Sequence, residues 1–297
     1  MNQLKSVIYW VFKKAIIPFR GMGLSMRYPF KPAYELIIKY IIPNKTKMVE
    51  INGYKMLVSI GAGRDSVGIG QRLIYDHEFD PSLTKVVKQI VRLGMNCVDV
   101  GANIGYYTLL LAELSDSKVV AFEPESKNFT DLTNNILLNG YKNIEIRREA
   151  VGDSNTFMTL YVSDLSSGRH SLIVDRTGHS EKVIVPVVKL DSVINHKVDF
   201  IKIDTEGNDL NVLKGAERII KESPDLIIAM EFWLEGLENL KVTPIDAFNY
   251  IYSLGFKYIY LVDEWQQTCK KTDILGTLDY IKKHGSGCNL ILSKGEL

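Results

Sequence analysis

The feature of this 297-residue chain that most constrains its fold is an alternation of short apolar runs and amphipathic segments between residues 97 and 231. The apolar runs read CVDV, VVAFE, IEIRREAV, FIKID and DLIIAMEF. The segments between them, such as IGYYTLLLAEL and DLNVLKGAERII, have the apolar spacing of helices. Buried strands that alternate with helices predict a parallel sheet covered on both faces. The sequence therefore predicts a doubly wound, Rossmann-like α/β domain.

Other patterns flank this core. Residues 48–75 contain short alternating runs with the hairpin signal Asn52-Gly53, and residues 82–93 have helical periodicity that Gly94 ends. The stretches FMTLYV and KVIVPVV predict an antiparallel insertion, and between them lies a loop rich in Ser, Gly and His. After a helix at 245–254, the strands FKYIYLV and NLILS predict an antiparallel hairpin at the sheet edge.

The N-terminal segment differs from the rest in charge. Residues 1–47 hold nine Lys or Arg and one acid, a net charge of +8, so the remaining residues carry 27 bases and 34 acids, or -7. We expect a basic helical arm with a short β lead-in over 1–74 and one catalytic domain over 75–297. Lys13 and Lys14 interrupt the apolar runs of the arm well before the roughly 20 residues that a membrane span needs.

Two interpretations of the arm remain open. Its aromatic and basic residues could form an amphipathic helix on an anionic membrane surface or glycan, which would make the protein membrane-peripheral. Alternatively, the arm packs on the body as an ordinary helix with its lysines in water. The three cysteines, Cys97, Cys269 and Cys288, lack any CxxC spacing. They support neither a zinc site nor a disulfide framework, and a reducing cytoplasm fits them best.

A candidate cofactor loop follows the first strand of the core. In VDVGANIGYYTLLL, Gly101, Asn103 and Gly105 lie between a strand and a helix, where backbone N–H groups can approach a ligand. Glu123 ends the next strand, 18 residues after Gly105, where a carboxylate can accept hydrogen bonds from ribose hydroxyls. A dinucleotide site would need GxGxxG, and Asn103 stands where its second glycine belongs. S-adenosylmethionine has no phosphate and a cationic amino group, so it suits this acidic loop better; an ordinary loop without a ligand is the remaining alternative.

Several ordered motifs together resemble one family. The segments VDVGANIGYYTLLLA, AFEPESKNF, EAVGD, VVKLDSV and IKIDTEGND, within roughly residues 75–235, resemble the FkbM-type S-adenosylmethionine-dependent methyltransferases. The resemblance implies a class I methyltransferase domain with a mostly parallel seven-stranded sheet and a cofactor over the strand tips. It also implies O-methylation of a hydroxyl on a sugar or secondary metabolite.

The resemblance implies a role for each matching residue. Asp99, Gly101, Asn103 and Gly105 would line the methionine end of the cofactor, and Glu123 would hold its ribose. The ribose and adenine would lie near Asn128, Ala150 and Val151, and an acid in the DHEFD stretch, Glu78, would lie near the methionine moiety.

The catalytic candidates lie in FIKIDTEGND. Asp204 and Glu206 end the strand whose tip should face the transferred methyl group, and a general base there would remove a proton from the acceptor. The alternatives are structural: Asp204 could cap the next helix, and Glu206 or Asp209 could lie in its first turn. Lys202 could pair with one of these acids and keep it ionised. Two acids two residues apart are weak evidence for a metal, and we expect none.

The leading hypothesis is therefore a methyltransferase that acts on a small molecule or glycan. The alternatives are an NAD(P)-dependent oxidoreductase and a non-catalytic cofactor-binding module. The loop at 163–180 with its histidines, together with Phe232 and Trp233, is the expected acceptor pocket. Nucleic acid is not an expected partner, because the positive charge is confined to the arm.

Overall fold

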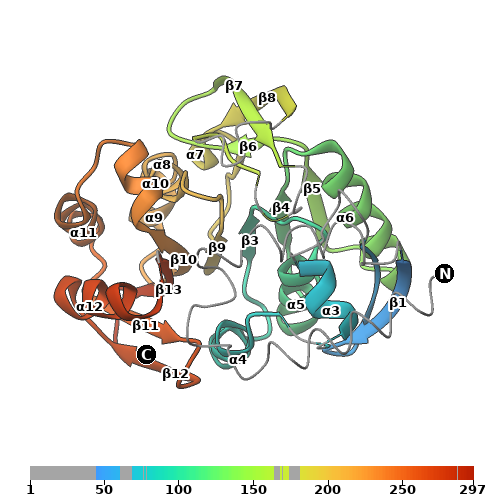
Figure 1. Ribbon diagram of the computed structural model, residues 1–297, viewed down its shortest axis with the longest axis horizontal. Coiled ribbons are helices and arrows are strands. Elements are labelled where there is room, and N and C mark those ends of the chain that lie inside the picture. The colour runs from blue at the N-terminus through green and yellow to red at the C-terminus, as the bar shows by residue number, and fades with distance from the viewer. Residues whose placement is uncertain are drawn as a thin grey trace, which may run out of the picture.

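The computed structural model describes residues 45–60, 69–75, 77, 79–163, 168, 170–173, 181–285 and 287–297. Its largest element is an eight-stranded sheet with helices on both faces (Figure 1). The strand order is β12 (Thr268–Lys271), β11 (Tyr258–Asp263), β13 (Gly287–Ser293), β10 (Ile227–Trp233), β9 (Phe200–Ile203), β3 (Cys97–Val100), β4 (Val119–Phe122) and β5 (Ile144–Arg147).

The sheet is parallel from β10 to β5 and antiparallel from β10 to β12. The predicted seven strands are thus one too few, because the polar segment Thr268–Lys271 turns back on β11 as an edge strand. The predicted C-terminal strands do lie antiparallel, but β13 inserts between β10 and β11. A helix, α12 (Ile274–His284), separates β12 from β13 in the chain, so the two predicted strands form no simple hairpin.

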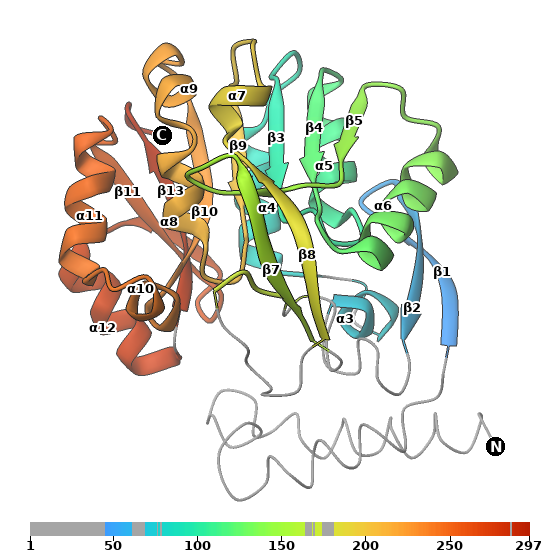
Figure 2. The same cartoon turned by 90° about the horizontal axis from the view of Figure 1, so that it is seen from above.

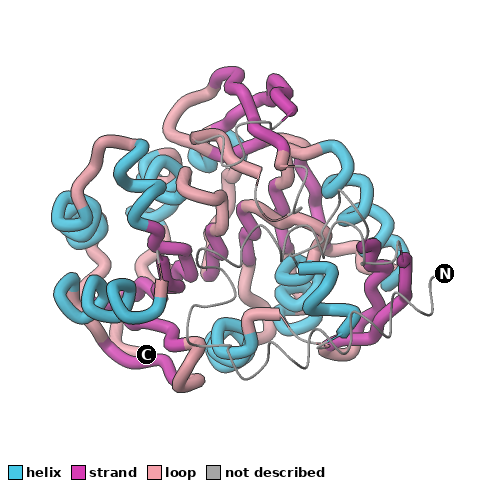
Figure 3. Tube along the Cα trace, viewed as in Figure 1, coloured by secondary structure: helices cyan, strands magenta, loops and turns pink. Residues whose placement is uncertain are grey.

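Two layers of helices enclose the sheet (Figure 3). Strands β3, β4 and β9 are buried along their whole length, as their apolar sequences require. One apolar cluster joins the sheet to the layer that contains α4, α5 and α6, and a second joins it to the layer from α7 to α12. The helices are α4 (Pro81–Ile90), α5 (Tyr106–Ser115), α6 (Ser126–Asn139), α7 (Leu190–Val193), α8 (Asp209–Lys214), α9 (Glu217–Glu222), α10 (Leu234–Asn239) and α11 (Pro244–Ser253).

The chain leaves the sheet centre in two directions. From β3 it proceeds to β4 and β5, and it later returns through β9 to β10 on the other side of β3. The carboxyl ends of β3 and β9 are therefore neighbours at the point where the strand order reverses, which is where open α/β sheets bind ligands.

The N-terminal hairpin forms where predicted. Strands β1 (Lys45–Ile51) and β2 (Tyr54–Ile60) pair around Asn52 and Gly53, whose φ angles of 55° and 91° match the two positive values of a tight hairpin turn. Hydrogen bonds between the backbone of β2 and the side chains of Asn135 and Asn139 fix the hairpin to α6. The short helix α3 (Ile69–Tyr75) follows it. Of the predicted basic segment, residues 1–47, the part before Lys45 lies outside the described residues, and no described helix is long and apolar enough to cross a membrane.

The insertion forms a separate small sheet of β6 (Ala150–Val151), β7 (Thr156–Val162) and β8 (Glu181–Val188), which crosses in front of the strand ends (Figure 2). The antiparallel pairing of β7 with β8 confirms the prediction. IEIRREAV, expected as one strand, is divided between β5 and β6, because its first half pairs with β4 and its second half with β8. The insertion thereby forms one wall of the space above the main sheet.

Candidate functional site

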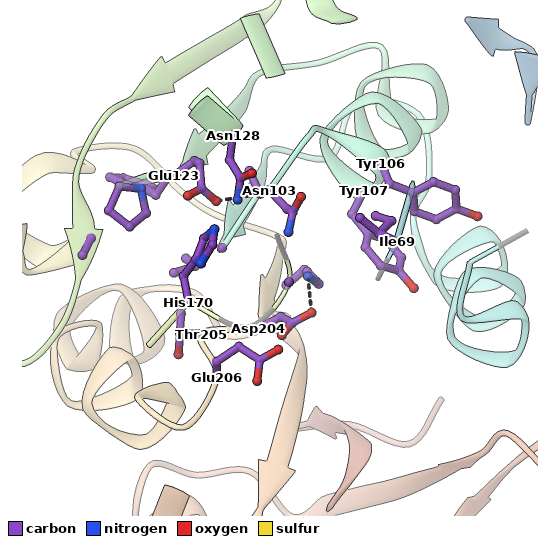
Figure 4. A pocket seen from close by; sticks show the side chains of 18 of the residues that line it. Ile69, Asn103, Tyr106, Tyr107, Glu123, Asn128, His170, Asp204, Thr205 and Glu206 are labelled. Carbon is purple, nitrogen blue, oxygen red and sulfur yellow. Dashed lines mark hydrogen bonds and ion pairs between the residues drawn. The ribbon is translucent and has the colours of Figure 1, made fainter. Parts of the chain in front are cut away.

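A cavity of about 250 Å³ opens at the carboxyl ends of β3, β4 and β9, beneath the insertion. Eight predicted site residues line it: Gly101, Asn103, Glu123, Asn128, Ala150, Val151, Asp204 and Glu206. Figure 4 shows Glu123 and Asn128 on one side of the cavity and Ile69 with Tyr107 on the other, with Asp204 and Glu206 below. Segments that are distant in the sequence thus converge on one site.

The loop after β3 is shaped by close backbone contacts. Gly101 has φ 83°, and a Cβ atom there would lie 1.9 Å from the carbonyl oxygen of Asp204. The amides of Gly101 and Ala102 both donate to the carbonyl of Phe122. The packing of the β3 and β9 tips therefore requires this glycine, whereas the sequence analysis assigned that requirement to the ligand. Two residues after Gly101, Asn103 adopts φ 51°, and its amide donates to Glu123 at the end of β4.

Glu123 is fixed by this loop. Its Oε2 accepts a hydrogen bond from the amide of Asn103 at 2.8 Å, and its Oε1 accepts one from the amide of Glu125 at 2.9 Å. Burial raises the pKa of Glu123 to about 7, although both backbone donors favour the ionised form. A carboxylate oriented in this way at the end of the second strand can accept hydrogen bonds from vicinal hydroxyls. Asn128, buried in the first turn of α6, lies beside it (Figure 4).

Three predicted cofactor residues are not part of the described lining. Asp99 is fully buried in β3, where its Oδ2 accepts a 2.6 Å hydrogen bond from Thr108 below the cavity. Gly105 is the N-cap of α5 with φ 98°, and a Cβ atom there would meet the side chain of Leu132. Glu78 lies outside the described residues.

The tip of β9 carries an ion pair between a buried lysine and a partly exposed aspartate. Lys202, 4% exposed, donates from Nζ to Asp204 Oδ2 at 3.0 Å, and its ammonium lies 4.8 Å from the ring centre of Tyr107 (Figure 4). Burial alone would lower the pKa of Lys202, but Asp204, Asp99 and Asp80 outweigh it and raise that pKa. The lysine is therefore charged, and it fixes one oxygen of Asp204 at the cavity floor.

The acids after Asp204 have separate roles. Asp209 begins α8, as its alternative interpretation predicted, and its two oxygens accept from the amides of Thr205 and Gly207. Burial raises the pKa of Asp209 to about 6. The N-cap of α8 is Asn208, so neither Asp204 nor Glu206 caps it. Glu206 adopts φ 53° in the turn and lines the cavity.

The insertion contributes Gly168, His170 and Leu172 to the lining. His170 Nδ1 accepts a hydrogen bond from the amide of Ser163 at 3.0 Å, so in the neutral ring the proton is on Nε2. Ser171 donates from Oγ to the carbonyl of Glu206 at 2.8 Å and connects the insertion to the β9 turn. Phe232 and Trp233, expected in the acceptor pocket, are buried in the core and do not line this cavity.

Three charged residues of the lining, Arg72, Asp80 and Glu149, were not predicted from the sequence. Arg72 of α3 and Asp80, just before α4, form an ion pair with 3.2 Å between Nη1 and Oδ1. The signal in the sequence was only partial, because Asp80 closes the DHEFD stretch in which Glu78 was chosen. An acid immediately before Pro81 is most simply interpreted as a helix cap.

The site fits the adenosyl cofactor expected from the motifs. Besides the carboxylate of Glu123, the cavity is lined by the buried hydroxyls of Tyr107 and Thr205, and that of Thr205 has no hydrogen-bond partner among the described residues. A ligand that brings polar groups would satisfy them. No group of His, Cys, Asp or Glu suited to a metal ion occurs in the described part of the chain. Fold and site together are those of a class I S-adenosylmethionine-dependent methyltransferase domain.

The comparisons with known proteins identify the family. The methyltransferase FkbM domain matches residues 99–258, more than half of the chain, and the protein belongs to this family. Methyltransferase 1 of Beauveria bassiana is 24% identical over 143 residues, which cover 40% of this chain and 57% of that protein. The methyltransferase FkbM of Methylobacillus flagellatus is 22% identical with a TM-score of 0.45, over 72% of this chain and 48% of that one. TYW2 of M. jannaschii, solved with AdoMet, is 12% identical with a TM-score of 0.40, over 84% and 85% of the two chains.

The family assignment bears on the cofactor hypotheses. The matched domain is a methyltransferase domain, which favours S-adenosylmethionine over a dinucleotide as the cofactor. The chain spans about half the length of the first relatives it matches.

Proposed function

We propose that the protein methylates a hydroxyl oxygen of a saccharide or secondary metabolite. The observation that supports this proposal most is the position of Asp204. Its carboxylate lies at the tip of β9, next to the cofactor loop after β3, and lines the same cavity as Glu123. A hydroxyl is a weak nucleophile near neutral pH, and this carboxylate is within the cavity that the acceptor must enter.

The bound cofactor supplies a methyl group on a positively charged sulfur. During transfer a bond forms between the acceptor oxygen and the methyl carbon, the methyl–sulfur bond breaks, and its electron pair stays on sulfur. The hydroxyl proton must leave, and we assign Asp204 as its acceptor. Lys202 holds Oδ2, which leaves Oδ1 for the hydroxyl. Because the Nδ1 atom of His170 already accepts a bond, we assign this histidine to donate to the acceptor from Nε2.

The charge of the cavity supports an uncharged acceptor. Among its described lining residues are five acids (Asp80, Glu123, Glu149, Asp204 and Glu206) and two bases (Arg72 and Lys202), a formal charge of -3. An acidic cavity repels phosphate groups, so it disfavours a nucleic acid and favours a sugar or similar hydroxyl compound.

Transfer of label tests this proposal. The purified protein with methyl-tritiated S-adenosylmethionine is incubated with glycan and metabolite extracts from cells that lack the gene. We expect label in a product that resists nuclease, protease and mild alkali, since an ether survives alkali and a methyl ester does not. Label in nuclease-sensitive or alkali-labile material would refute the proposed acceptor, and cofactor binding without any transfer would favour a non-catalytic module.

Variants of the two acids test their roles. Asp204→Asn should lower kcat by about 10²- to 10⁴-fold, the usual contribution of a general base, with S-adenosylhomocysteine affinity nearly unchanged. Glu206→Gln should mainly raise the KM for the acceptor. Asp225→Asn is the control, since its side chain is 84% exposed and is not part of the lining. Normal turnover in Asp204→Asn would remove this residue from the mechanism.

A further inference from the structure

Asp80 has a conformation that its sequence position does not explain. It stands at the N-cap of α4 with φ 42° and ψ 65°, and its side chain makes no capping hydrogen bond. An aspartate before a helix that begins with proline would normally accept a bond from the next free amides. Here the carboxylate turns instead to Arg72 and the cavity.

Another residue caps the helix. The carboxylate of Glu264, in the turn between β11 and β12, accepts from the amides of Ser82 and Leu83, each at 3.1 Å. These amides belong to the first turn of α4, which has no internal partners for them. The helix start is therefore satisfied without Asp80, and capping does not account for an acid at this position.

The surroundings of Asp80 disfavour its charge. Burial raises the pKa of Asp80 to about 7; the charge of Arg72 on α3 lowers it, those of Asp204 and Glu264 raise it, and Lys202 lowers it. The backbone is also left-handed, which an aspartate tolerates at some cost. A carboxylate kept in a cavity wall at this cost, with its capping role taken over, indicates a ligand with positive charge.

The position in the cavity identifies the part of the cofactor concerned. Glu123 and Asn128 define the ribose side, whereas α3 and Tyr107 form the opposite side (Figure 4). Asp80 lies with this second group, because its partner Arg72 belongs to α3. The buried Tyr107 hydroxyl lies near enough that the charge of Asp80 contributes to its raised pKa. An acid, a cation and a buried hydroxyl are thus available at the end of the cavity away from Glu123.

We propose that the Asp80–Arg72 pair binds the amino-acid end of S-adenosylmethionine, with Asp80 receiving the α-ammonium and Arg72 the α-carboxylate. The amino-acid end carries one positive and one negative group, and these match the negative Asp80 and the positive Arg72. The Tyr107 hydroxyl is a further hydrogen-bond donor for the α-carboxylate. Asp99, expected at this end, is enclosed in the sheet. The proposal rests on the cofactor and is independent of the proposed acceptor.

Calorimetric titration with two ligands tests the proposal. S-adenosylhomocysteine has the amino-acid end, and 5′-methylthioadenosine lacks it while keeping the adenosine. Asp80→Asn should weaken S-adenosylhomocysteine binding by about 10- to 100-fold, the value of a charge-assisted hydrogen bond, and leave methylthioadenosine within about twofold. Arg72→Gln should weaken S-adenosylhomocysteine binding by about threefold, because the Arg72 side chain is 54% exposed.

A third ligand separates the two residues. The decarboxylated analogue of S-adenosylhomocysteine keeps the amine and lacks the carboxylate, so Asp80→Asn should weaken its binding and Arg72→Gln should not. The removal of a destabilised charge means that Asp80→Asn should unfold no more easily than the wild type at about pH 8. Unchanged S-adenosylhomocysteine affinity, or equal losses for both adenosine ligands, would overturn the proposal. A selective loss in Glu78→Gln, with none in Asp80→Asn, would also overturn it.

Discussion

Replacement of Gly101 by alanine tests the packing of the two strand tips. A Cβ atom at this position would lie 1.9 Å from the backbone oxygen of Asp204 and 2.9 Å from its carbonyl carbon. No side-chain rotation relieves a contact with backbone, so the tips of β3 and β9 must separate. Gly94 is a matched control, because its φ of 85° is almost that of Gly101, at 83°, but no atom lies within 4 Å of its Cβ position.

The expected free energies differ accordingly. Gly94→Ala should reduce the free energy of unfolding by about 1 to 2 kcal/mol, the cost of a left-handed alanine. Gly101→Ala carries the same cost and, in addition, about 1 to 3 kcal/mol or more for overpacking, so its total should exceed about 3 kcal/mol. Urea denaturation followed by circular dichroism measures both, and titration with S-adenosylhomocysteine should show weaker binding only in Gly101→Ala. Equal losses of stability in the two variants would refute the argument from close approach.

The charged groups of the site and of the α4 cap give three further predictions. Lys202→Met leaves Asp99 and Asp204 without their cation, so it should cost about 3 kcal/mol of stability at about pH 8 and less at acid pH, because burial raises the pKa of Asp99 and protonation removes its charge; equal costs in urea denaturation at both pH values would contradict this. Burial raises the pKa values of Asp80 and Glu123 to about 7, so the affinity for S-adenosylhomocysteine should fall as the pH drops through 7. Calorimetry should show a shallower fall for methylthioadenosine, whose binding depends on Glu123 but not on Asp80. Glu264→Ala should lower the free energy of unfolding by about 1 to 2 kcal/mol through loss of the α4 cap, whereas Glu296→Ala, near the C-terminus, should have little effect in the same thermal denaturation.

The sequence was most informative where structure is local. The apolar strands, the helix periodicity and the Asn52-Gly53 turn depend on neighbouring residues, and all are found in the structure. The eighth strand was missed because Thr268–Lys271 is polar and short, and only its pairing with β11 makes it a strand. The long helix predicted from Asp209 is divided into α8 and α9 at Gly215, whose Cα approaches the backbone of Gly152 too closely for a side chain. Such contacts cannot be inferred from periodicity.

In the candidate site, too, residues were predicted where local sequence decides their position and missed where distant residues do. Glu123 and Asp204 were predicted because each ends a strand, and the ends of parallel strands share one edge of the sheet. Asp99 is not part of the described lining, because a strand alternates its side chains and this one points toward α5, where its carboxylate accepts a hydrogen bond from Thr108. Asp80 was missed because its orientation depends on Glu264, a residue 184 positions later in the chain.

The cap that Glu264 provides to α4 means that the cofactor cavity depends on residues beyond the end of the family domain. The family match stops at residue 258, yet the carboxylate that completes the α4 start lies beyond it. A protein shortened only at its C-terminal side, to residue 258, would lose this cap, and the strands β12 and β13 with it. The amides of Ser82 and Leu83 would then compete for the carboxylate of Asp80, the acid at the helix start. The C-terminal turn thus keeps Asp80 available to the cavity, and the smallest unit that retains this arrangement is longer than the family domain.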